Sequence, residues 1–278
     1  MRMIPGLAAL EDVADGFLVD QFGTIHDGEN PCPGAVDALR RLRAAGKKVI
    51  LLSNSGRRGW LNEERLDAMG IGKECYEASL SSGEVAWAAL SADPPAVLRR
   101  HCRVLLFARG RSLDILDGFD VELVEDARDA DLVMLAGSET DRHGYDALWV
   151  RLEPAARRGI PAICTNPDRV MMVGGALYPG AGALADAYRA AGGTVLWFGK
   201  PHPQIYAAAF RRLPGISRRR IVGVGDSIEH DIAGAAAQGC RTLLVRTGIL
   251  AGADTAGLDS EMARFGARPD AIVPEFVW

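Results

Sequence analysis

The stretch IVGVGDSIEHDIAGAAAQG, residues 221–239, indicates how this chain folds. It begins with an apolar run typical of a buried strand, and a helical stretch follows the acids after that run. The same order, an apolar run that leads into a polar residue, occurs at residues 17–20, 49–53 and 195–200. Between the first two runs, apolar residues three apart predict a helix that ends near Gly46. Strands that alternate with helices predict an α/β fold with a doubly wound parallel sheet.

A middle block of the chain carries strand and helix patterns of its own. Its expected strands are residues 104–107, 132–135 and 162–164, and its expected helices lie around residues 84–90 and 145–157. The block has the length of a small domain. We therefore expect a smaller α/β domain at residues 84–175, inserted into a core made of residues 1–83 and 176–278.

The composition is that of an ordinary globular chain. Of 278 residues, 48% are hydrophobic and 24% are charged, with 36 acids, 32 bases and a net charge of −4. This balance provides no excess of positive charge for nucleic acid. The longest uncharged run, residues 170–185, is shorter than the about 20 apolar residues of a membrane span. We therefore expect neither a nucleic-acid partner nor a membrane partner, and the sequence leaves a homodimer open.

The compartment and the cysteines give two further expectations. Glu11 and Asp12 precede any long apolar stretch, so we expect no signal peptide and a cytoplasmic location. Five cysteines are scattered without a CxxC pair, which argues against a disulfide framework and against a zinc site.

Polar side chains follow the four apolar runs. They are Asp20, Ser53, Lys200 and Asp226. In open parallel sheets, ligands bind beyond the carboxyl ends of the strands. A carboxylate can attack phosphorus, two carboxylates can hold Mg²⁺, and a lysine with a hydroxyl can position a phosphoryl group. The set therefore predicts phosphoryl transfer through an aspartyl-phosphate.

Two details sharpen this prediction. Lys200 is the only lysine after residue 73 in a chain that otherwise uses arginine, and a compact ammonium does not replace a planar guanidinium. Asp231 lies five residues after Asp226, in the first turn of the expected helix, and glycines at 223 and 225 allow close backbone approach. We therefore interpret Asp226 and Asp231 as metal ligands and Lys200 as a retained functional residue.

These residues resemble the four motifs of the haloacid dehalogenase superfamily of hydrolases. The motifs correspond to residues 20–24 (DQFGT), 53–54 (SN), 199–201 (GKP) and 225–227 (GDS) with Asp231. The insert between the second and third motifs resembles the α/β cap of class IIA members, which include nitrophenyl-phosphatase-like and nucleotide or sugar phosphatases.

The resemblance implies an Mg²⁺-dependent phosphohydrolase that acts on a small phosphorylated metabolite such as a sugar, nucleotide, aryl or acyl phosphate. It implies Asp20 as nucleophile, with Ser53 and Lys200 on the phosphoryl group. It implies a metal held by Asp20, the backbone carbonyl of Phe22, Asp226 and Asp231. The substrate-binding residues that it implies are Gly23, Thr24 and Asn54 in the core, and Asn166 and Asp168 in the cap.

Phe22 departs from the family pattern. Members usually carry a second aspartate here, as general acid and base, and a phenyl ring cannot transfer a proton. Three explanations stay open: an acidic leaving group that departs unprotonated, a substitute such as His26 or Asp27, or binding without turnover. For His26 and Asp27 the interpretation as a local turn is favoured.

Two further activities of the superfamily do without the second aspartate. A metal-independent 2-haloacid dehalogenase, whose family members carry an aromatic residue at this position, is the main rival. It ranks below a phosphatase because such members lack a large cap and need no Mg²⁺. Phosphonate cleavage needs a cap lysine, and the middle block has none. Arg57 and Arg58, after the second motif, are expected to be solvated.

Overall fold

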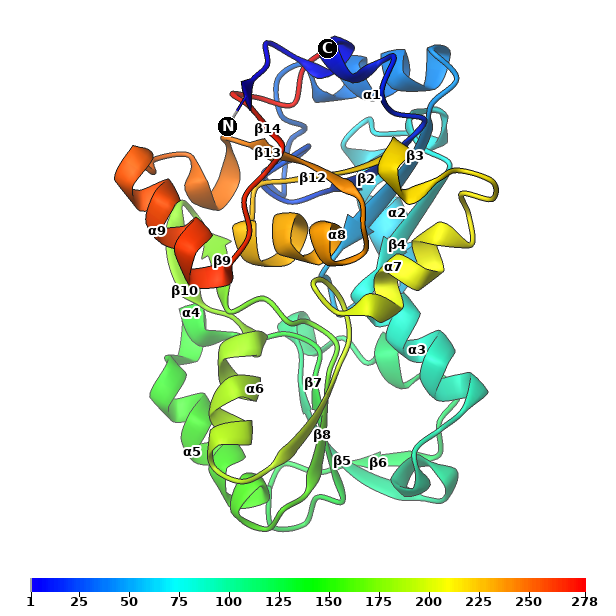
Figure 1. Ribbon diagram of the computed structural model, residues 1–278. Helices are drawn as coiled ribbons and strands as arrows, with labels where there is room; N and C mark the ends of the chain where they lie inside the picture. Colours follow the sequence, from blue (N-terminus) through cyan, green and yellow to red (C-terminus); the bar gives the residue numbers. More distant parts are fainter. Residues whose placement is uncertain (1) are drawn as a thin grey trace. The chain divides into compact units, whose positions relative to one another are not determined.

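The computed structural model describes residues 2–278, apart from the side chain of Arg111. The chain forms two compact units (Figure 1). The core unit consists of the residues up to Ser53, Trp60–Leu80 and Lys200–Trp278. The cap unit consists of Asn54–Gly59 and Ser81–Gly199.

A seven-stranded sheet with the order β1-β14-β13-β12-β2-β3-β4 forms the centre of the core unit. Its strands are β1 (Arg2–Met3), β2 (Gly16–Asp20), β3 (Lys48–Ser53), β4 (Ala78–Ser81), β12 (Ile221–Gly225), β13 (Arg241–Val245) and β14 (Ala271–Val273). The pairings of β2 with β3 and of β2 with β12 are parallel. Crossovers on both sides of β2 confirm the doubly wound fold predicted from the sequence.

Helices cover the faces of the core sheet. They are α1 (Ala35–Ala44), α2 (Gly59–Ala68), α7 (Pro203–Phe210), α8 (Gly234–Ala237) and α9 (Thr255–Phe265), with a π-helical turn at Ile228–Ala233 before α8. The apolar residues Leu39 and Leu42 of α1 pack with Phe17, Val19 and Val49 of the sheet in one buried cluster. The expected helix near Gly46 is α1, and Gly46 follows it in the left-handed region at φ +74°.

The register of the central strands determines where the polar side chains lie. Asp20 of β2 is opposite Leu52 of β3, so Ser53 is the next residue along the neighbouring strand. Val224 of β12 is opposite Val19, so Asp226 lies just beyond the end of its strand. Because parallel strands have their carboxyl ends at one edge, Asp20, Ser53 and Asp226 share that edge.

The cap unit has its own parallel sheet, with the order β11-β8-β7-β5-β6. Its strands are β5 (Cys102–Phe107), β6 (Val121–Leu123), β7 (Leu132–Leu135), β8 (Pro161–Cys164) and β11 (Thr194–Trp197). Its helices are α3 (Ser82–Ala92), α4 (Thr140–His143), α5 (Tyr145–Arg157) and α6 (Ala181–Ala190). Leu148, Leu152 and Tyr188 bring α5 and α6 onto one face of the sheet.

The expected second boundary of the inserted domain, at residue 176, is wrong. The run at residues 195–198 forms β11, which pairs with β8 in the cap sheet rather than with a core strand. Residues 176–199 therefore belong to the cap unit, together with the antiparallel hairpin of β9 (Val170–Val173) and β10 (Ala176–Pro179). An apolar run predicts a strand but carries no information on which of two parallel sheets it joins.

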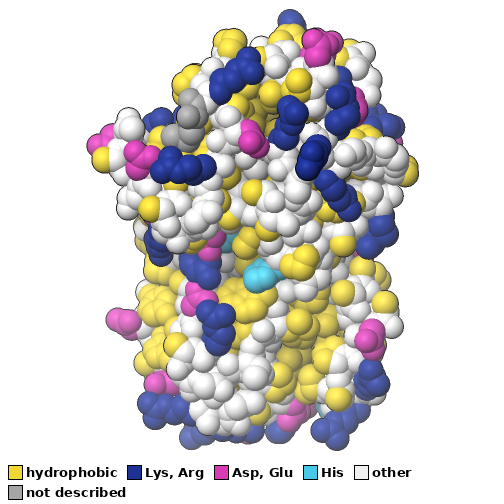
Figure 2. All heavy atoms as spheres, viewed as in Figure 1, with side chains coloured by type: hydrophobic (Ala, Val, Ile, Leu, Met, Phe, Trp, Pro, Cys, Tyr) yellow, Lys and Arg dark blue, Asp and Glu magenta, His cyan; other side chains and the backbone are white. Residues whose placement is uncertain are grey.

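Charged side chains are spread over the surface. On the face shown in Figure 2, lysines and arginines lie among acids and apolar patches. Among the described residues, none of the helices combines the length and the hydropathy that a membrane span requires.

Candidate active site

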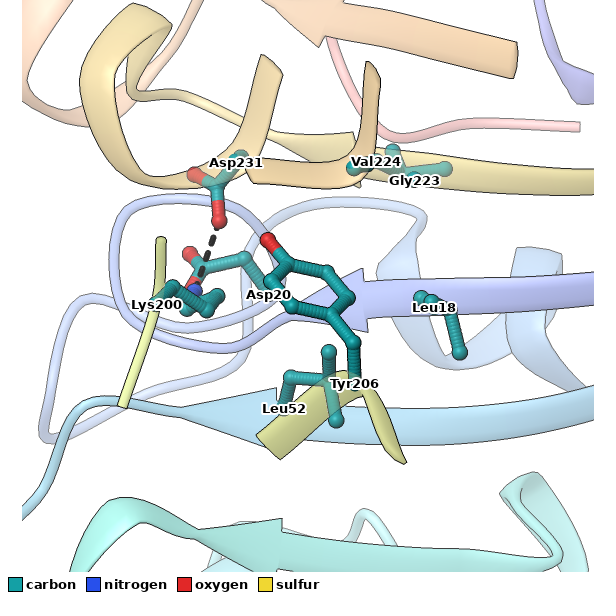
Figure 3. A pocket seen from close by; sticks show the side chains of 9 residues that line it. Leu18, Asp20, Leu52, Lys200, Tyr206, Gly223, Val224 and Asp231 are labelled. Carbon is teal, nitrogen blue, oxygen red and sulfur yellow. Dashed lines mark hydrogen bonds and ion pairs between the residues drawn. The ribbon is translucent and has the colours of Figure 1, made fainter. Parts of the chain in front are cut away.

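Lys200 lies between two carboxylates at the carboxyl edge of the core sheet. Its Nζ is 2.5 Å from Oδ1 of Asp20 and 2.6 Å from Oδ1 of Asp231. Figure 3 shows the three side chains converging beside Tyr206. The adjoining cavity measures only about 10 Å³, which is room for one water at most. The predicted convergence of Asp20, Lys200 and Asp231 is therefore present in the structure.

Asp226 joins this group from the end of β12. One carboxylate oxygen from each of Asp20, Asp226 and Asp231 lies within 4.8 Å of the others, and all three residues are buried. Oδ2 of Asp226 accepts a hydrogen bond from the backbone N–H of Ile249 at 2.8 Å. Gly248 has φ +60°, and a Cβ there would lie 1.8 Å from Oδ2 of Asp226. The position of Asp226 thus depends on a residue without a side chain at 248.

The cluster carries more negative than positive charge. When all three carboxylates are ionised they face one ammonium, which leaves two negative charges in excess. Burial and the neighbouring carboxylates raise the pKa of Asp226 well above its usual value. Burial raises the pKa of Asp231 to about 7, although Lys200 opposes this. Burial alone would lower the pKa of Lys200, but Asp20 and Asp231 outweigh it and raise that pKa. Oxygen donors with this excess charge fit a divalent cation.

The loop after Asp20 is held by bonds within itself. Gly23 donates its N–H to the carbonyl of His26, and Thr24 donates its N–H to the carbonyl of Gln21. The Thr24 hydroxyl donates to Oδ2 of Asp20 at 3.0 Å. In this structure both amides therefore have acceptors within the loop. Thr24 also contacts the expected nucleophile.

Phe22, His26 and Asp27 form a structural turn. The Phe22 ring meets the His26 imidazole edge-on at 6.0 Å between centroids. Nδ1 of His26 accepts the N–H of Gly28 at 3.1 Å, so this nitrogen carries no proton. Burial and Arg65 lower the pKa of His26 to about 4. The exposed carboxylate of Asp27 accepts the N–H groups of Glu29 and Asn30, which lower its pKa. The favoured interpretation as a turn agrees with these bonds.

The expectation that Asn54 lies in the core is wrong, because the structure places Asn54 in the cap unit with Asn166 and Asp168, while Ser53 is in the core unit. Nδ2 of Asn54 donates to Oδ1 of Asp168 at 2.7 Å. Oδ1 of Asn166 accepts the N–H of Asp168 at 3.2 Å, in the loop that follows β8. The structure therefore brings Asn54 and Asp168 into contact, although they are 114 residues apart. Ser53 ends β3 beside the strand of Asp20.

The expectation of a solvated side chain is wrong for Arg58. Its guanidinium pairs with Glu84 at 2.7 Å and lies over the ring of Trp87 at 3.6 Å from the centroid. Glu84 and Trp87 belong to α3, so sequence spacing gave no sign of this contact. The sequence interpretation also assigned no role to Tyr206 and His230. Tyr206 contacts His230, and His230 contacts Lys200.

Comparison with known protein families shows the class of protein to which this chain belongs. A haloacid dehalogenase-like hydrolase family model matches residues 17–122, and a HAD-hydrolase-like model matches residues 197–277. The chain belongs to the haloacid dehalogenase-like hydrolases, and it is an enzyme of that family with a class IIA cap.

Individual relatives are similar over most of their length. The sugar-phosphatase AraL of Bacillus subtilis is 32% identical over 84% of this chain and 83% of that protein. A haloacid dehalogenase-like hydrolase structure from Brucella suis is 32% identical, with a TM-score of 0.83 over 99% of this chain and all of that one. A glycerol phosphate phosphatase from Mycobacterium tuberculosis in complex with magnesium is 25% identical, with a TM-score of 0.71 over 96% of this chain and 77% of that one.

Proposed function

We propose that the protein is a Mg²⁺-dependent phosphohydrolase of a small phosphorylated metabolite, with Asp20 as the nucleophile. The observation that carries the proposal is the buried group of Asp20, Lys200, Asp226 and Asp231 at the carboxyl edge of the core sheet. The names of the relatives, a sugar-phosphatase and a glycerol phosphate phosphatase, support phosphate monoesters as the substrate class.

Asp20, Asp226 and Asp231 would hold the cation, and the carbonyl of Phe22 is proposed as a fourth ligand. The fit rests on the three carboxylate oxygens within 4.8 Å and on the two negative charges that Lys200 leaves uncompensated. When bound, Mg²⁺ would supply positive charge to the phosphoryl oxygens and shield the carboxylates from the incoming dianion.

The chain's own residues would carry out two displacements. A carboxylate oxygen of Asp20 forms a bond to phosphorus, and the bond from phosphorus to the leaving oxygen breaks with its electron pair on that oxygen. The oxygen of a water molecule then forms a bond to phosphorus, and the bond between Asp20 and phosphorus breaks with its electron pair on the carboxylate. Both protons of the water leave on inorganic phosphate, so the Asp20 carboxylate is restored. Lys200 holds Asp20 in place and places an ammonium beside the transferred group, and Ser53 would donate its hydroxyl to a phosphoryl oxygen.

The loop after Asp20, which carries Phe22, His26 and Asp27, indicates which leaving groups suit this enzyme. Phe22 has no proton to give, and His26 is neutral at pH 7 because its pKa is about 4. Asp27 is an exposed carboxylate bound to local amides. None of these three side chains is a proton donor at neutral pH. We therefore propose that aryl and acyl phosphates, whose leaving groups depart as anions, react faster than alkyl phosphates.

A single assay tests the proposal. Phosphate release from p-nitrophenyl phosphate and from acetyl phosphate is measured with Mg²⁺, with chelator, and with Asp20→Asn. We expect Mg²⁺-dependent release that falls at least about a thousandfold in Asp20→Asn, because the nucleophile is lost. Release equal to that of the Asp20→Asn control would refute the proposal. Saturable binding without turnover would favour a phospholigand-binding protein, and halide release from a 2-haloacid without metal would favour a dehalogenase.

A further inference from the structure

His230 contacts the backbone of Lys200 directly. Its Nδ1 lies 3.1 Å from the carbonyl oxygen of Lys200, and its side chain is only 10% exposed. His230 precedes Asp231, whose carboxylate pairs with Nζ of the same lysine. The π-helical turn Ile228–Ala233 thus contacts both ends of Lys200, through a ring at the main chain and a carboxylate at the ammonium.

We infer that His230 is a positioning residue for Lys200: it donates Nδ1–H to the Lys200 carbonyl and so places the ammonium between Asp20 and Asp231. The inference rests on the proposed function, in which Lys200 acts on the phosphoryl group. In that proposal His230 contacts neither the metal nor the substrate.

The chemistry of the contact determines the proton position. A carbonyl oxygen only accepts hydrogen bonds, so Nδ1 must carry a proton for this bond to form. The other ring nitrogen, Nε2, lies 3.7 Å from Oε2 of Glu229. The backbone of the turn is itself held, because His230 donates its N–H to Oγ of Ser227 at 3.1 Å. The ring therefore projects from a fixed backbone toward Lys200.

A second contact fixes the same segment. The hydroxyl of Tyr206 donates to the backbone carbonyl of His230 at 3.0 Å, and Tyr206 is buried. A Cβ at Gly234 would lie 2.2 Å from this hydroxyl and 3.0 Å from Cα of Pro201. Tyr206 and Pro201 thus approach the turn more closely than a side chain at 234 would allow. The segment that carries Lys200 is held against the π-helical turn at two points.

Such a contact matters because a lysine side chain is flexible. Its ammonium is reached through four carbons, so its position depends on where its backbone is held. Misplacement of a catalytic group by about 1 Å can lower a rate by about a hundredfold. Loss of the His230 contact is therefore expected to reduce kcat while the chain stays folded.

Substitution of His230 by asparagine or glutamine distinguishes loss of the hydrogen bond from loss of packing. The amide nitrogen of Asn lies as many bonds from the main chain as Nδ1 of histidine, and that of Gln lies one bond further, like Nε2. On p-nitrophenyl phosphate we expect His230→Leu and His230→Gln to lower kcat by about 10- to 100-fold with a smaller change in KM. We expect His230→Asn to recover most of that loss. Thermal melting confirms that each variant is folded.

The ring proton offers a test without any substitution or turnover. In a long-range ¹H–¹⁵N spectrum of the full chain, we expect Nδ1 of His230 to carry a proton. An unprotonated Nδ1 overturns the inference, and so does a folded His230→Leu variant with wild-type kcat. A wild-type protein that releases no phosphate would refute the proposed function instead, and the spectrum would still decide the hydrogen bond.

Discussion

Phe22 shows how one side chain can determine the substrate range of a site. Its half-buried ring packs against His26, and a Cβ on Gly28 would lie 3.0 Å from that ring. The ring has no acidic proton to supply. Removal of a positioned acid typically costs about 100- to 10,000-fold for a leaving group that needs protonation. The rate for an activated leaving group falls much less, so the effect of Phe22 on the rate depends on the substrate.

Phe22→Asp tests this dependence. We expect turnover of an alkyl phosphate such as glycerol phosphate to rise by about tenfold or more, because the new carboxyl group can protonate the leaving oxygen. Turnover of p-nitrophenyl phosphate should change by less than about threefold, since its leaving group needs no proton. Phe22→Leu serves as the control for lost ring packing. An equal effect of Phe22→Asp on both substrates would contradict this account.

At the scale of elements, the loop after β13 positions the end of β12. Gly248 and the N–H of Ile249 both contact Asp226, and a Cβ on Gly248 would also lie 2.8 Å from Cα of Gly23. The loop that carries Gly248 therefore also packs against the loop after Asp20. The site depends on this packing because Asp226 has to approach Asp20 and Asp231 against their charge repulsion.

Gly248→Ala and Gly266→Ala form a matched pair. Both glycines have φ near +60°, but a Cβ at 266 meets nothing within 4 Å. Each substitution should cost about 1 kcal/mol of stability through backbone strain. Only Gly248→Ala should also raise the Mg²⁺ concentration for half-maximal activity, by about tenfold or more, because it displaces Asp226. Equal Mg²⁺ requirements in the two variants would show that Asp226 does not depend on this loop.

At the scale of the whole molecule, the buried acids couple stability to pH. The pKa of Asp231 is raised from 3.8 to about 7, so the folded chain binds its proton more tightly than the unfolded chain. This contribution to stability is complete below pH 3.8 and is lost as pH rises through 7. His26 acts in the opposite sense, because its pKa is lowered from 6.5 to about 4. Its contribution is lost as pH falls through that range.

Thermal melts without metal can separate the two groups. Asp231→Asn removes the acid and keeps His26. The stability of the wild type relative to Asp231→Asn should therefore fall as pH rises from about 4 to 8. Added Mg²⁺ should raise the wild-type Tm more at pH 8 than at pH 5.5, since protons compete with the cation for the same carboxylates. A stabilisation by Mg²⁺ that does not depend on pH would contradict the assignment of these ligands.

Much of the candidate site could be predicted from the sequence, because its polar residues directly follow predicted strands. Asp20 and Asp226 follow neighbouring parallel strands, and the carboxyl ends of such strands meet at one edge. Asp231 stays close because it lies in the turn directly after Asp226. Lys200 lies beside Asp20, as the sequence predicted, but it does not follow a strand of the core sheet. It follows β11 of the cap sheet and reaches Asp20 from a connecting segment.

The sequence by itself determined the α/β class, the doubly wound core and the set of acids around Lys200, because periodicity and strand ends are local properties of the chain. Only the tertiary structure decided the sheet to which β11 belongs and the contacts of His230, Tyr206, Arg58 and Gly248. These contacts join residues far apart in the chain or depend on the direction of one side chain. Packing selects that direction, and packing is a property of the folded molecule.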